Sequence, residues 1–219
     1  MAKSHRGVRP GSGRQTDLRR GPSSREPRPA ILIDTNGKST EPDYFNALKF
    51  LPWAQAARVV VVFTNGAPVE VVRDAARRKR ASEFDQAWAV CDVDEFPTEK
   101  ATAVARTGGV GLAWSNPCFE LWLILHLAGH TSHLENGERA CERISRLLGR
   151  DFDKTELNFP AFEAGIADAV ERAKLLEPPP TANPSTNVWE LLERWATAAN
   201  RTQQWRAAKP WWIETWRAR

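Results

Sequence analysis

Two aspartates, Asp92 and Asp94, are the residues of this sequence whose types and spacing best suit chemistry. They follow an apolar run from Ala87 to Val90 that is typical of a buried strand, and Pro97 closes the segment. Ligands of open α/β sheets bind at the carboxyl ends of the strands, and residues i and i+2 of extended backbone point the same way. Carboxylate oxygens suit Mg²⁺ or Mn²⁺, so the pattern predicts a metal site. The alternative is a pair of solvated loop acids.

Three further acids lie close to the ends of predicted elements. Asp34 ends the first predicted strand, residues 30–34, and Glu41 lies in the first turn of a helix that Thr40 can cap. Glu120 lies in a helix that is apolar on nearly all sides, where a carboxylate is costly unless it is paired or bound to a metal. Glu120 can therefore be a further acid of the site, or it can satisfy backbone donors near the helix start.

Alternating strands and helices must position these acids. The periodicity predicts an α/β fold with a mostly parallel sheet covered on both faces, followed by a second half that is helical from about residue 134. The predicted strands are residues 30–34, residues 58–63, the segment before Asp92, and residues 110–114. Four of the predicted helices cover residues 68–82, 98–106, 136–148 and 159–176. Of the other three, one begins at Thr40, one begins at Asn116–Pro117, and the last runs from a cap at Ser185 or Thr186 to Ala199.

The net charge of +4 is concentrated at the N-terminus. Residues 1–30 hold eight Lys or Arg against two acids, which leaves −2 for the remainder. Residues 1–28 have almost no large apolar side chains, so we expect a disordered basic tail that contacts nucleic acid or only aids solubility. The segment 201–219 is rich in Trp and Arg, and it either closes the helical core or presents a surface to a partner.

The composition favours a cytoplasmic protein. The three cysteines form no CxxC pair, so a disulfide framework is not expected. The most apolar stretch, residues 119–127, is far shorter than the roughly 20 residues that a membrane span requires. We therefore expect no membrane association.

Four motifs occur in an order and at separations that resemble the RloB-like family. They are Thr40-Glu-Pro-Asp-Tyr-Phe45, Trp88 with Asp92-Val-Asp-Glu-Phe-Pro97, Ser115-Asn-Pro-Cys-Phe-Glu-Leu-Trp122 with His126, and Asn183-Pro-Ser-Thr-Asn-Val188. The resemblance covers roughly residues 30–197, within a domain placed at 29–200. It implies a Toprim-like, Rossmannoid fold and a phage-defence (abortive infection) effector that cuts DNA or RNA with Mg²⁺ or Mn²⁺, often encoded beside an ATPase.

The resemblance also implies a particular set of acids. A Toprim site pairs a glutamate after the first strand with an Asp-x-Asp after the third, and Asp92 and Asp94 match the second of these. At the first position this sequence has Asn36-Gly37 where the family usually has Glu-Gly. An amide supplies no charge and takes no proton, so we expect Asp34 or Glu41 to replace the missing acid.

Two functions follow from the resemblance. In the first, the protein is a nuclease in which Asp34, Asp92 and Asp94 hold the metal, Glu41 and Glu120 complete the site, and three basic residues contact phosphates. Those basic residues are Lys38, Arg77 and Lys154, although the cationic helix face that carries Arg77 can simply be solvated. In the second, the loss of the acid at Asn36 leaves a binding or regulatory subunit of the partner ATPase.

Overall fold

The computed structural model describes residues 28–93 and 96–200, without the side chains of the last two. The predictions for the basic tail, for Asp94 and for the segment 201–219 lie outside these residues. Within them, five strands form one sheet in the order β2-β1-β3-β4-β5. The strands are β1 (Ala30–Thr35), β2 (Arg58–Phe63), β3 (Gln86–Asp92), β4 (Gly111–Asn116) and β5 (Ser185–Thr186). The first four are parallel and β5 is antiparallel to β4, which confirms an α/β fold of the Rossmann-like kind.

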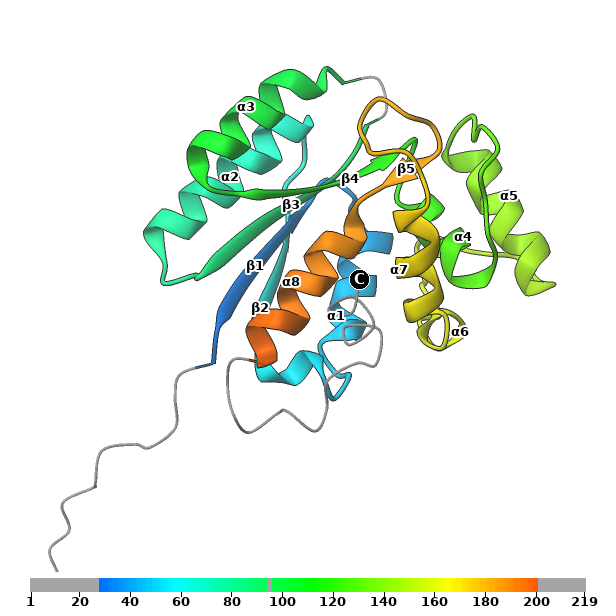
Figure 1. The fold of residues 1–219 in the computed structure, drawn as a ribbon, viewed down its shortest axis with the longest axis horizontal. Coiled ribbons are helices and arrows are strands. Elements are labelled where there is room, and N and C mark those ends of the chain that lie inside the picture. The colour runs from blue at the N-terminus through cyan, green and yellow to red at the C-terminus, as the bar shows by residue number, and fades with distance from the viewer. Residues whose placement is uncertain (1–27, 94–95, 201–219) are drawn as a thin grey trace, which may run out of the picture.

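Helices cover both faces of the sheet, as the alternating pattern predicts (Figure 1). Helices α2 (Pro68–Ala81) and α3 (Thr98–Gly108) cover one face, whereas α1 (Thr40–Leu48) and α8 (Val188–Asn200) cover the other. Beside α1 and α8 lies a helical group of α4 (Glu120–Leu127), α5 (Gly137–Leu148), α6 (Pro160–Glu163) and α7 (Ile166–Lys174). A 3₁₀ turn, η1 (Ala54–Ala56), leads from α1 towards β2 and contacts α8. Among the described residues, none of the helices has the length and apolar character to cross a membrane.

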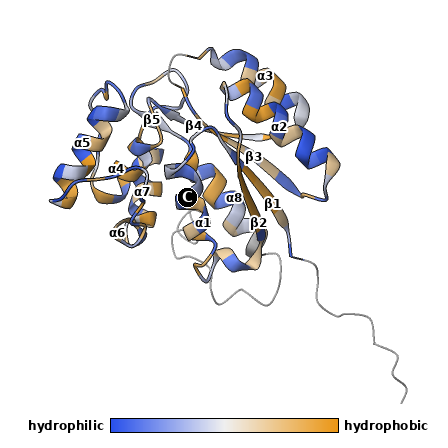
Figure 2. Cartoon of the chain, turned by 180° about the vertical axis from the view of Figure 1, so that it is seen from behind, coloured by the Kyte–Doolittle hydropathy of each residue, from blue (hydrophilic) through white to orange (hydrophobic). Residues whose placement is uncertain are grey.

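The alternation of side chains along each strand decides which face a site residue can reach. Ile31 and Ile33 of β1 pack in the core beneath α1 and α8, whereas Leu32 packs beneath α2 and α3. In β3, Trp88 and Val90 belong to the first core. Figure 2 shows β1 as hydrophobic, while α2 carries both hydrophobic and hydrophilic residues, as expected for a helix with one buried side.

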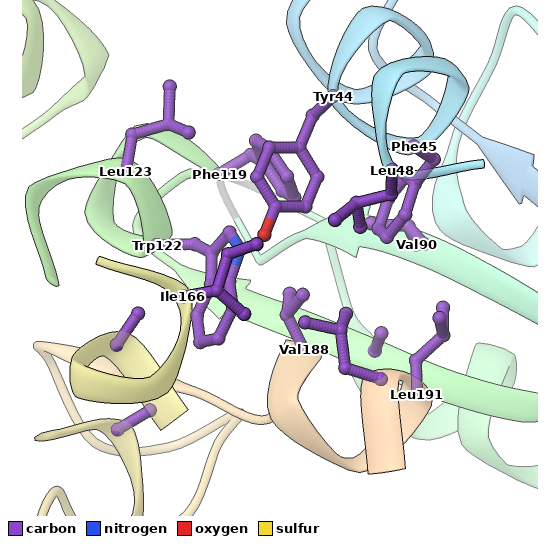
Figure 3. Packing of buried hydrophobic residues seen from close by; sticks show 14 of the residues in the cluster. Tyr44, Phe45, Leu48, Val90, Phe119, Trp122, Leu123, Ile166, Val188 and Leu191 are labelled. Carbon is purple, nitrogen blue, oxygen red and sulfur yellow. The ribbon is translucent and has the colours of Figure 1, made fainter. Parts of the chain in front are cut away.

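An aromatic cluster fixes α1 against α4 (Figure 3). The Tyr44 ring makes edge contacts with Phe119, Trp122 and His126. His126 is fully buried, which lowers its pKa to about 4 and keeps the ring neutral. Its Nδ1 donates to the Phe162 carbonyl at 2.7 Å, so its Nε2 accepts from the Tyr44 hydroxyl at 3.1 Å. Because both ring nitrogens are satisfied, the histidine acts as a structural bridge between the two helices.

Two helix predictions are wrong in their boundaries. The helix expected to start at Asn116–Pro117 begins at Glu120, because Asn116 still belongs to β4 and pairs with Ser185 of β5. The residues Ser185 and Thr186, expected only as a helix cap, therefore form a buried strand, although the Thr186 hydroxyl still accepts a hydrogen bond from the first amide of α8.

The predicted helix 159–176 is divided into α6 and α7 at Gly165. The Gly165 backbone packs directly on the His126 carbonyl, and a Cβ at this position would overlap the carbonyl oxygen. The chain thus bends where it must pass closely over α4.

Gly165→Ala tests this close approach. We expect the free energy of unfolding to fall by about 1–3 kcal/mol, because the new methyl group meets backbone that cannot easily move. Gly129→Ala is the matched control, since nothing lies within 4 Å of a Cβ there, and its effect should stay within about 0.5 kcal/mol. Urea unfolding of both variants measures the difference, and equal effects would show that the packing at Gly165 is not tight.

Candidate active site

A cleft of about 360 Å³ opens at the carboxyl edge of the sheet, where α/β folds place their ligands. We call it the acid cleft. It is lined by Gly37, Lys38, Ser39, Thr40, Glu41, Asp92, Pro117, Cys118, Glu120, Glu135, Asn136, Gly137, Lys154 and Thr155. The loops after β1, β3 and β4 therefore meet there with the start of α5 and the loop that precedes α6.

Glu41 lies at the base of the acid cleft and is only 4% exposed. Its carboxylate accepts hydrogen bonds from its own backbone N–H and from that of Gly37. The contact requires glycine, since a Cβ on Gly37 would overlap the carboxylate. Burial, together with the neighbouring charge of Glu120, raises the pKa of Glu41 to about 7, although Lys154 acts in the opposite direction.

Glu120 lies on the adjacent wall and is 8% exposed. The Thr40 hydroxyl lies 3.4 Å from Glu120 Oε1 and 3.0 Å from the Lys154 carbonyl oxygen, which it links. The Cys118 thiol also hydrogen-bonds Glu120, and burial raises the pKa of this thiol far above its usual value. The prediction that Thr40 caps α1 is wrong, because Thr40 is the first residue of the helix and Ser39 occupies the N-cap position. The Ser39 side chain makes no capping hydrogen bond.

Asn36 joins the ends of β1 and β3. Its backbone N–H donates to the Val90 carbonyl at 3.2 Å, and its Oδ1 accepts from the Asp92 N–H at 3.3 Å. The Asn36 side-chain oxygen is thus directed to the backbone N–H of Asp92. Asn36 therefore has a structural role here, and the carboxylate that contacts the neighbouring Gly37 is that of Glu41.

Asp34 and Arg77 lie away from the acid cleft. Asp34 follows the same alternation as Leu32, so it faces α2, where its Oδ2 accepts a hydrogen bond from the Thr64 hydroxyl at 3.2 Å. Its other oxygen, Oδ1, has no hydrogen-bond partner in the described part of the chain, and burial raises its pKa to about 6. Arg77 pairs with Asp74 on the exposed side of α2. The structure thus brings together Glu41, Asp92, Glu120, Lys38 and Lys154.

The donor set of the acid cleft suits a hard cation. Glu41, Asp92 and Glu120 all line it and offer carboxylate oxygens, the ligand type that Mg²⁺ prefers. In residues 28–93 and 96–200, no three or more His, Cys, Asp or Glu side chains already stand together as a metal site. The predicted ligand Asp94 lies outside these ranges, two residues after Asp92 on the chain.

Sequence reasoning missed the polar neighbours of the acids. Thr40, Cys118, Asn136 and Gly137 all line the acid cleft. Asn136 caps α5 by accepting from the Arg139 N–H at 3.0 Å, and neither this cap nor its place beside the acids was predicted from the sequence. Thr40 and Cys118 each stand one or two residues from an acid within a motif, and that proximity was the available signal.

The comparisons with known proteins place every residue of the acid cleft inside one family domain. The family model described as RloB-like protein matches residues 31–194, from β1 into α8. The chain belongs to the RloB-like family. No curated protein and no solved structure matches this RloB-like chain. All three of its cysteines are free thiols.

Glu41→Gln should change how stability depends on pH. The folded state raises the pKa of Glu41 from 4.5 to about 7, so it binds a proton more tightly than the unfolded chain, and wild-type stability should fall as pH rises through this range. Asp34, raised to about 6, acts in the same direction at lower pH. The variant should lose the Glu41 share of this fall, which extends from about pH 4.5 to above pH 7 and is on the order of 3 kcal/mol.

Urea unfolding at several pH values, with a chelator present, measures this effect. Glu138→Gln is the control, because Glu138 is an exposed acid of α5. An unchanged pH profile in Glu41→Gln would show that Glu41 is not held in a buried, proton-binding state.

Proposed function

We propose that this RloB-like protein is a metal-dependent nuclease that cleaves DNA or RNA in phage defence. The observation that carries the proposal is the position of Glu41, whose buried carboxylate lies against Gly37 in the same cleft as Asp92 and Glu120. A buried carboxylate such as Glu41, whose pKa is raised by burial and by the neighbouring Glu120, is a costly arrangement, and a divalent cation bound between the two side chains would offset the cost.

The site acids divide into two groups in this proposal. Glu41 and Asp92, together with Asp94, would hold Mg²⁺ or Mn²⁺, which when bound activates water and stabilises charge on the phosphoryl oxygens. Glu120 is oriented by Thr40 and Cys118 in the same cleft, and in this proposal it is the general base of the reaction. In the Toprim-like interpretation, Glu41 takes the role of the acid missing at Asn36, and Asp34 supports the sheet from the other face.

Two lysines of the acid cleft can bind the substrate. Lys38 and Lys154 are exposed and line its opening, above the buried acids. Their charges would hold a phosphodiester next to the carboxylates and reduce repulsion between the acids and the nucleic acid.

The role in defence and the association with an ATPase rest on the family resemblance. Asn36 stands where the family usually has glutamate, and this difference supports the second candidate, a binding or regulatory subunit of that ATPase.

Cleavage assays on labelled DNA and RNA, tRNA included, test the proposal. With Mg²⁺ or Mn²⁺ present, we expect the wild type to cut, and we expect Glu41→Gln and the double variant Asp92→Asn with Asp94→Asn to lose at least about 10²-fold in rate. Asp34→Asn should keep most of the activity, because its side chain faces α2. Glu138→Gln is the control for loss of an exposed acid.

The possible results separate the two candidates. Full activity in Glu41→Gln would contradict the role of this residue, and loss only in Asp34→Asn would return the role to Asp34. A wild type that binds nucleic acid but never cuts, with either metal and with the ATPase added, would support the regulatory subunit.

A further inference from the structure

Strand β2 is an edge strand without the usual protection against pairing. In the described part of the chain it pairs only with β1. Its sequence, Arg-Val-Val-Val-Val-Phe, has no Pro, no Gly and no charge between its ends. The four valines are half-buried and Phe63 is 39% exposed. Natural edge strands usually carry charges, prolines or bulges that block association, so this strand is suited to pair with another.

The hydrogen bonds to β1 show which backbone groups of β2 face outward. Arg58 N–H donates to the Pro29 carbonyl at 2.7 Å, and Thr64 N–H donates to the Thr35 carbonyl at 3.0 Å. Because successive residues of a strand direct their backbone groups to opposite sides, Val60 and Val62 also face β1. The N–H and C=O groups of Val59, Val61 and Phe63 therefore point away from the sheet.

This pattern is self-complementary. In an antiparallel pair, hydrogen-bonded residues lie opposite each other and exchange both bonds. If two copies of β2 meet about a two-fold axis through Val61, then Val61 lies opposite itself and Val59 lies opposite Phe63 of the second copy. All three outward-facing residues are then bonded in both copies. A shift by one residue would instead place outward groups opposite inward ones.

We propose that the outer edge of β2 binds a second copy of this chain, in antiparallel register with Val61 on the two-fold axis. The side chains favour this occupant as well, since an aromatic residue opposite a β-branched one is a stabilising cross-strand pair. The only charged side chain of the strand, Arg58, lies over the Phe84 ring of its own chain, 5.3 Å from the centroid, and does not guard the edge. The resulting dimer has one continuous sheet through both copies.

The dimer has a consequence for the acid clefts, which rests on the proposed function. Because the two sheets run antiparallel, their carboxyl edges face opposite sides of the dimer. The two clefts would therefore act separately, on different phosphodiesters, and would not cut both strands of a duplex at one point.

Cysteine cross-linking tests the register in the full-length protein. In a Cys141→Ser background, Val61→Cys should form a disulfide-linked dimer under mild oxidation, because paired residues of this type have Cα atoms about 5.5 Å apart. Val60→Cys is the matched control, since Val60 would lie opposite Val62 and about 7–8 Å from its own copy. Sedimentation should show a dimer for the wild type.

Proline substitutions test the interface independently of cysteine chemistry. Val61→Pro removes only an outward N–H, so it should give a folded monomer, whereas Val62→Pro removes a bond to β1 and should destabilise the fold itself. A monomeric wild type would overturn the proposal. If hydrogen exchange of the Val61 amide in that monomer became faster after deletion of residues 201–219, the C-terminal segment of the same chain would be what covers the edge of β2. Equal cross-linking at positions 60 and 61, or a dimer that survives Val61→Pro, would overturn the proposal as well.

Discussion

The contact between the Glu41 carboxylate and the Gly37 backbone determines how the acid cleft is built. The carboxylate takes hydrogen bonds from the turn after β1, and this is possible only because the turn has no side chain at that point. The price is a buried carboxyl group next to Glu120, with its pKa raised to about 7. A carboxyl group in this position is more stable when it is protonated or bound to a cation than when it carries a free negative charge.

The rest of the fold keeps Glu41 and Glu120 next to each other. Glu41 lies in the first turn of α1 and Glu120 begins α4, and the Tyr44–His126 hydrogen bond joins these two helices inside the core. His126 is held in turn by the Phe162 carbonyl, and Gly165 lets α7 pass over its backbone. The aromatic cluster therefore has a positional role for the cleft in addition to its contribution to stability.

Much of the architecture could be predicted from the sequence because buried parallel strands are continuous apolar runs. The range of β2 is confirmed residue for residue, and α2 and α5 are confirmed to within one residue at each end. The strand β5 could not be predicted, because two polar residues become a strand only through their pairing with the end of β4.

The choice between Asp34 and Glu41 shows where sequence reasoning stops. Both faces of the sheet are covered by helices, so alternation along β1 does not say which face carries the cleft. Only the packing of α1 and α4 shows that Asp34 lies on the far side and that Glu41 turns back towards Gly37. The predicted ligand Asp94 stays a prediction.

Calorimetric titration of Mn²⁺ tests the central claim, that Glu41 replaces the acid missing at position 36, most directly. We expect that the wild type binds Mn²⁺, that Glu41→Gln does not, and that adding Asn36→Glu to Glu41→Gln restores binding. Mn²⁺ binding by Glu41→Gln with the affinity of the wild type would contradict it.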